Sequence, residues 1–105
     1  MTVGELICEL KKYFQLLPVM FVSGSGGEEH VRLILLDDLR ISKVFLAPHG
    51  ERGLLAGELA SRLNKLGFAF SGSEVFFLTQ ARESAKIHRV GVSDENEYVI
   101  LSGEN

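Results

Sequence analysis

The chain contains one cysteine, two prolines and no tryptophan among its 105 residues. Its single cysteine, Cys8, cannot form an internal disulfide or a cysteine-based zinc site, which agrees with a reducing compartment. No segment is apolar for long enough to span a bilayer, and Glu5, Glu9 and Lys11 interrupt the apolar positions that a signal peptide would need. We therefore expect a soluble, cytoplasmic protein that does not bind a membrane.

The sequence also lacks an excess of positive charge. Its formal net charge is −3, and acidic and basic residues are mixed along the chain, so we expect no nucleic-acid partner. Hydrophobic residues make up 46% and charged residues 24% of the chain, which is too apolar for intrinsic disorder. Residues 1–105 therefore fit one domain with a single core.

The first helical pattern lies near the N-terminus. Apolar residues recur at intervals of three and four over residues 3–17, which predicts an amphipathic helix that ends before Pro18. Thr2 and Glu5 have the spacing of a capping box at its start. Cys8 is expected on the outward face of this helix.

A second amphipathic helix is predicted over residues 51–66, with Gly67 as the residue that ends it. Leu54 is expected to face outward, opposite the leucine-rich face. The flank between the two faces carries small side chains, so a neighbouring backbone could approach closely. The predicted interface residues on this helix are Gly53, Leu54, Gly57 and Ala60.

The remaining apolar runs have the length and composition of strands. Residues 31–36 are apolar on both faces except Arg32, which predicts a central strand. Residues 87–92 and 97–101 have the pattern of a hairpin. The order of elements predicts an α+β domain with a largely antiparallel sheet of about five to six strands and both helices on one face. The other predicted strands are 18–23, 43–47 and the region 68–79, which fits either one bulged strand or a tight hairpin.

Two polar segments resemble functional loops but lack the residues for them. The glycine-rich segment 23–29 has no Gly-Lys-Ser/Thr sequence and ends in two glutamates, so we interpret it as a hairpin loop rather than a phosphate-binding loop. Asp37 and Asp38 are interpreted as the start of a solvated turn.

The turn His49-Gly50-Glu51-Arg52 is the segment with the most chemical potential. Free amides of the first helical turn, together with Arg52 and His49, could bind a small anion, although Glu51 would already complement the helix dipole. A strand-to-helix turn with a surface histidine fits the same residues. His49, Arg52 and Arg89 are the ligand-binding candidates, and His49 and His88 are the catalytic candidates. The three histidines lie in separate segments, so no metal site is predicted.

These observations favour a small binding or interaction protein that is a homo-oligomer or an accessory subunit, with no cofactor. The alternative is a small enzyme or a small-anion-binding protein that uses the His49-Gly50-Glu51-Arg52 turn. A third possibility is a ligand cavity between sheet and helices, lined by Phe45, Phe70 and Phe77. Whether the protein is an enzyme stays open at this point.

Overall fold

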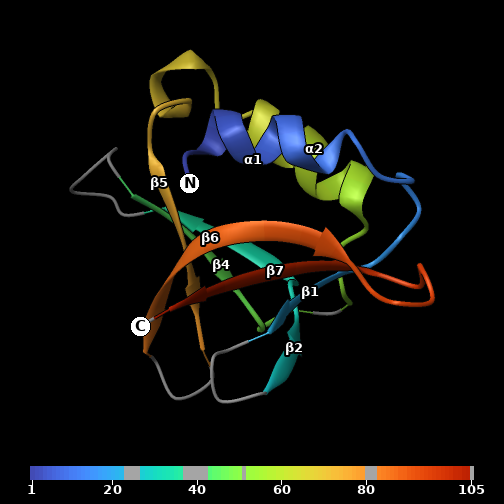
Figure 1. Cartoon of the computed structure of the whole chain (residues 1–105). Coiled ribbons are helices and arrows are strands. Elements are labelled where there is room, and N and C mark those ends of the chain that lie inside the picture. The colour runs from blue at the N-terminus through green and yellow to red at the C-terminus, as the bar shows by residue number, and fades with distance from the viewer. Residues whose placement is uncertain (23–26, 37–42, 51, 80–82, 105) are drawn as a thin grey trace.

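The computed structural model describes residues 1–22, 27–36, 43–50, 52–79 and 83–104. In these residues, two helices lie on one face of a curled, seven-stranded mixed sheet (Figure 1). The predicted α+β class is therefore confirmed, but the sheet has more strands than expected and two of its pairings are parallel. The elements are α1 (Val3–Leu10), β1 (Val19–Val22), β2 (Glu28–His30), β3 (Leu33–Leu36), β4 (Lys43–Ala47), α2 (Ala56–Asn64), the 3-10 helix η1 (Phe68–Phe70), β5 (Glu74–Leu78), β6 (Ser84–Val92) and β7 (Val99–Glu104).

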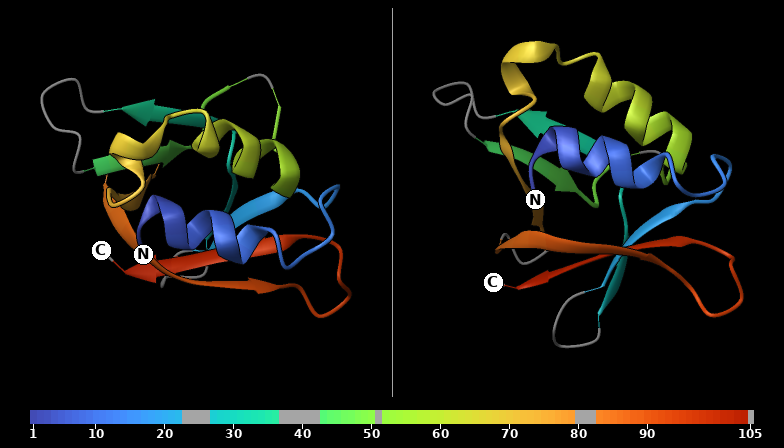
Figure 2. Two further views of the ribbon diagram at one scale, coloured as in Figure 1. Left: turned by 90° about the horizontal axis from the view of Figure 1, so that it is seen from above. Right: turned by 45° about the horizontal axis from the view of Figure 1, so that its top comes forward.

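The sheet curls so that its two edge strands follow each other along the chain. Its strand order is β2-β1-β7-β6-β5-β4-β3, yet only Val31 and Arg32 separate the two edge strands along the chain. The amide of Val31 donates to the carbonyl of Val19 in β1 (3.1 Å), and the amide of Arg32 donates to the carbonyl of Ala47 in β4 (2.9 Å). The chain thus passes directly from one edge to the other, and the sheet forms an open barrel beneath the paired helices (Figure 2).

The prediction of a central strand at residues 31–36 is wrong, because β3 lies at the edge of the sheet. Its apolar composition suggested burial on both faces, but Leu35 and Leu36 are 36% and 42% exposed. Part of the predicted loop at 23–29 is instead the strand β2. Residues 23–26 and the predicted turn at Asp37 and Asp38 lie outside the described residues.

The first helix has the predicted start but ends earlier than expected. Thr2 and Glu5 form the predicted capping box, and Cys8 is exposed as predicted, but α1 ends at Leu10 rather than at residue 17. The side-chain amide of Gln15 donates to the carbonyl of Leu10 (3.0 Å). The carbonyls of Gln15 and Leu17 accept hydrogen bonds from the first amides of α2. Residues 11–17 therefore bond to α2 instead of continuing the first helix.

The second helix begins at Ala56 rather than at residue 51. Leu54, in the predicted first turn, is instead bonded to two other segments: its amide donates to the carbonyl of Val31 (2.7 Å), and its carbonyl accepts from the amide of Val19 (3.0 Å). Leu54 is 2% exposed, so the prediction that it faces outward is wrong. Gly67 follows the helix with φ +91°, a conformation that favours glycine. Phe68 begins η1 rather than a strand.

The core lies between the helices and the concave face of the sheet. Its largest aromatic contact is the stacked pair Phe21 and Phe77, whose ring centroids are 4.3 Å apart. Phe45 alternates with the buried residues of β4, so it lies on the outer face, where its ring contacts Phe76. Phe45 and Phe77 therefore do not line a common cavity, and that prediction is wrong.

In the described part of the chain, no helix is long and apolar enough to cross a membrane.

Candidate functional site

The structure does not bring the predicted catalytic and ligand-binding residues into one site. His49 is exposed beyond the C-terminal end of β4, whereas His88 and Arg89 are exposed on β6. The strand register places Leu46 of β4 level with Phe77 of β5, which in turn pairs with Ala85 of β6. His49 therefore extends toward one end of the barrel, while His88 and Arg89 lie toward the other.

The amides at the start of α2 are already used as donors. Ala56 donates its amide hydrogen to the carbonyl of Leu17 (2.7 Å), and Gly57 donates to that of Gln15 (2.9 Å). The amide of Leu55 donates to the carboxylate of Glu58 (3.2 Å). The expected anion site on free helical amides is therefore not formed, and the turn around His49 does not directly precede the helix.

The four residues predicted as an interface contact the chain itself. Leu54 and Ala60 are only 2% and 5% exposed. A Cβ atom at Gly53 would lie 2.9 Å from Nδ1 of His30, and one at Gly57 would lie 3.0 Å from Cβ of Gln15. The small side chains thus permit close packing within the domain, and this flank has little surface left for a partner.

Arg52 is the predicted ligand-binding residue that does gain basic neighbours. It lines a hollow of about 310 Å³ with Arg32, from the link between β2 and β3, and Arg62, from α2. Leu33, Gly50 and Leu54 complete the lining, and we call this the arginine hollow. Helical and strand periodicity did not indicate Arg32 or Arg62 as ligand-binding residues. Arg32 is the single charge in an apolar run, and this could have signalled a special role.

One of the three arginines, Arg52, is paired with a carboxylate. The guanidinium of Arg52 donates to both carboxylate oxygens of Glu58, from Nη1 to Oε1 at 2.7 Å and from Nη2 to Oε2. Hydrogen bonds from Arg52 and from the Leu55 amide, with a further contribution from the charge of Arg62, lower the pKa of Glu58 from 4.5 to about 2. Glu58 is therefore ionised at neutral pH. Among the described residues, Arg32 and Arg62 have no ion-pair partner.

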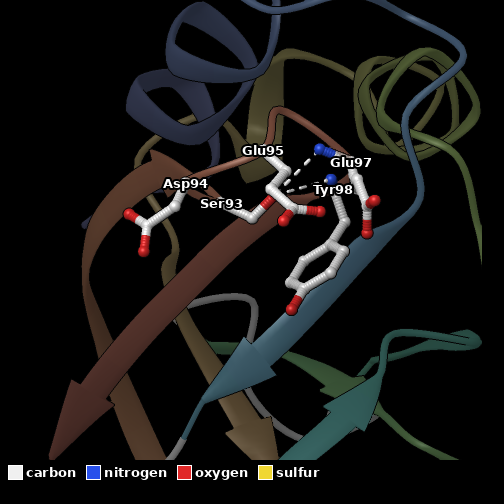
Figure 3. A pocket seen from close by; sticks show the side chains of 5 residues that line it. All are labelled: Ser93, Asp94, Glu95, Glu97 and Tyr98. Atoms are coloured by element: carbon white, nitrogen blue, oxygen red, sulfur yellow. Dashed lines mark hydrogen bonds between the residues drawn. The ribbon is translucent and has the colours of Figure 1, made fainter.

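A second hollow, of about 230 Å³, lies at the turn between β6 and β7. Ser93, Asp94, Glu95, Glu97 and Tyr98 line it (Figure 3). The Oγ atom of Ser93 accepts hydrogen bonds from the amides of Glu97 (2.8 Å) and Tyr98 (3.2 Å), so this serine closes the turn. In the described residues, no group of three histidine, cysteine, aspartate or glutamate side chains could hold a metal ion. The acidic side chains fit a solvated turn.

Large apolar side chains are exposed at three places on the described surface. Leu35 and Leu36 lie on the edge strand β3, Phe14 and Leu16 lie in the connection after α1, and Phe68 begins η1. Those on β3 differ from the others because they accompany a strand edge that is unpaired in the described residues.

A comparison of the chain with family models, curated proteins and solved structures finds no match.

Proposed function

We propose that this protein is a small interaction protein that works as a homodimer, joined through the free edge of β3. The observation that supports this proposal is the composition of the strand: all four residues, Leu33 to Leu36, are apolar, and the last two are exposed. An edge strand has unpaired backbone donors and acceptors, and proteins usually protect such an edge with charges, proline or a bulge. The described residues of β3 include none of these.

The opposite edge of the sheet has the usual protection. β2 carries Glu28 and Glu29, and pairing it with another copy of β2 would bring like charges together. The contrast between the two edges favours association through β3.

A second copy of the chain is the partner that best fits this edge. Two identical strands can pair in antiparallel fashion about a two-fold axis, which makes the same surface complementary to itself. With the axis at Leu35, this residue would lie opposite its own counterpart, and Leu36 would lie opposite Ile34 of the second copy. Since an edge of four residues should bury less than the roughly 1,000 Å² typical of a stable interface, we expect a reversible dimer.

Substitution of Leu35 by lysine tests the proposal. Light scattering after size-exclusion chromatography, at micromolar to millimolar protein, should show a concentration-dependent dimer that Leu35→Lys abolishes, since a charge at the edge opposes strand pairing. Leu16→Lys makes the same change at another exposed leucine and should leave the dimer intact. A monomeric mass at all concentrations, or loss of the dimer only in Leu16→Lys, would contradict the proposal.

Cysteine cross-linking tests the register. In a Cys8→Ser background, Leu35→Cys should give a disulfide-linked dimer on mild oxidation, because residues directly opposite in antiparallel strands have Cβ atoms about 4.5–5.5 Å apart. Glu29→Cys in the same background places the thiol on the other edge strand and should remain largely monomeric. Equal cross-linking of both variants would show that collision, rather than a defined edge, joins the molecules.

A further inference from the structure

We propose that the arginine hollow is a binding site for a doubly charged phosphate group, such as that of a small phosphomonoester. Three segments that are distant in the sequence meet there. Arg32 lies at the link between the two edge strands, Arg52 lies in the connection after β4, and Arg62 lies on α2. The curl of the sheet is therefore what places the three arginines around one hollow.

The backbone holds this arrangement closely. The amide of Arg32 donates to the carbonyl of Ala47 in β4 (2.9 Å). The amide of Leu54 donates to the carbonyl of Val31 (2.7 Å). These bonds hold the segments that carry Arg32 and Arg52 beside each other. Gly50 has φ +151°, and a Cβ atom there would lie 3.1 Å from both Cβ and the carbonyl oxygen of Arg32. Glycine thus permits the loop to pass next to Arg32.

The charges of the described residues favour a dianion. Among the described residues that line the hollow, three are arginines and none is acidic, in a protein whose formal net charge is −3. Arg52 is held by Glu58, whereas Arg32 and Arg62 have no ion-pair partner in the described residues and keep donors available. Leu33 and Leu54 supply the apolar part of the lining.

The size of the hollow and the side chains that line it suit a phosphate group. Guanidinium donors match the oxygens of phosphate in paired hydrogen bonds. The hollow, of about 310 Å³, leaves room for a phosphate with a small organic group. A nucleic-acid backbone fits less well because the negative overall charge opposes a polyanion.

The test is an NMR titration of the full chain with inorganic phosphate and with phenyl phosphate, observing backbone amides and arginine Nε–H groups. Saturable shifts should appear around residues 32, 52 and 62. Arg62→Gln and Arg32→Gln should each weaken binding by about tenfold or more, since each removes charge-assisted hydrogen bonds. Arg89→Gln removes the same charge from β6, outside the hollow, and should change affinity less than about twofold.

A change of pH separates recognition of the dianion from general attraction of anions. The second pKa of a phosphomonoester is about 6, so phenyl phosphate should bind more weakly at about pH 5 than at about pH 7.5, while the arginines stay charged. Sulfate stays doubly charged and should bind equally at both. Absence of saturable shifts, or equal weakening by Arg89→Gln and Arg62→Gln, would overturn the proposal. Because Arg62 lies on an exposed part of α2, its variant should fold normally.

Discussion

Phe76 and Phe77 are neighbours in β5, but they have different surroundings. Phe77 is fully buried and stacks on Phe21, with an angle of 14° between the ring planes. Phe76 lies on the outer face, where it contacts the ring of Phe45 and lies beneath the ammonium group of Lys43, at 5.4 Å from its ring centroid. The alternation of the strand therefore assigns one ring to the core and the other to the surface.

These surroundings predict different costs of truncation. Phe77→Ala should lower the free energy of unfolding by about 3–5 kcal/mol, because it leaves a cavity beside Phe21. Phe76→Ala should cost about 1–2 kcal/mol, since that ring is only half-buried. Urea denaturation of both variants measures the difference. Equal losses would contradict the assignment of faces.

At the scale of the elements, each helix depends on groups outside it. The first amides of α2 are bound by carbonyls of the connection after α1, and Glu58 joins the amide of Leu55 to the guanidinium of Arg52. The early end of α1 and the late start of α2 are consequences of the same contact. The start of α2 is therefore bonded to the connection that follows α1.

The ion pair of Glu58 predicts a loss of stability in acid. Its pKa is lowered from 4.5 to about 2 in the folded protein, mainly by the hydrogen bond from Arg52. A lowered carboxyl pKa adds stability above about pH 4.5, and this contribution is lost as the pH falls toward 2. Glu58→Gln keeps an acceptor for the Leu55 amide but has no carboxyl group to protonate. The melting temperature of this variant should therefore fall less than that of the natural protein between these pH values.

Glu95→Gln is the control for the change in net charge. It removes a carboxylate from the exposed turn between β6 and β7, where Glu95 has no ion pair in the described residues. If both variants change the acid dependence equally, the contribution comes from total charge rather than from the pair of Arg52 and Glu58.

At the scale of the whole molecule, closure of the barrel depends on a few backbone hydrogen bonds. The amides of Val31, Arg32 and Leu54 connect the two sheet edges and the segment before α2, although all three residues lie between the regular elements. Loss of these bonds would detach the link between β2 and β3 from β1, β4 and Leu54, and would disperse the residues of the arginine hollow.

Hydrogen exchange should reveal this role. The amides of Val31, Arg32 and Leu54 should exchange about as slowly as those of the core strands, because opening them requires opening the barrel. Gly72 lies in the turn before β5, makes no hydrogen bond in the described residues, and should exchange rapidly. Rapid exchange at Val31 and Arg32 would show that the link between β2 and β3 detaches from β1 and β4 while the rest of the sheet stays folded.

Local patterns in the sequence determined the class of the fold and several of its elements. The capping box of Thr2 and Glu5, the strand Lys43–Ala47 and the hairpin of β6 and β7 depend on residues that are close in sequence, so spacing alone revealed them. The outward position of Cys8 also followed from the helical period.

Only the tertiary structure decided which strand lies at an edge, where the helices end and which charges meet. Leu33–Leu36 resembles a central strand because apolar composition reports a tendency toward burial, not the number of neighbouring strands. Arg52 was a candidate from its sequence context, but Arg32 and Arg62 line the same hollow only because the sheet curls and α2 packs beside α1 above it. The physical reason is that such contacts depend on the path of the whole chain, which periodicity within a short window does not contain.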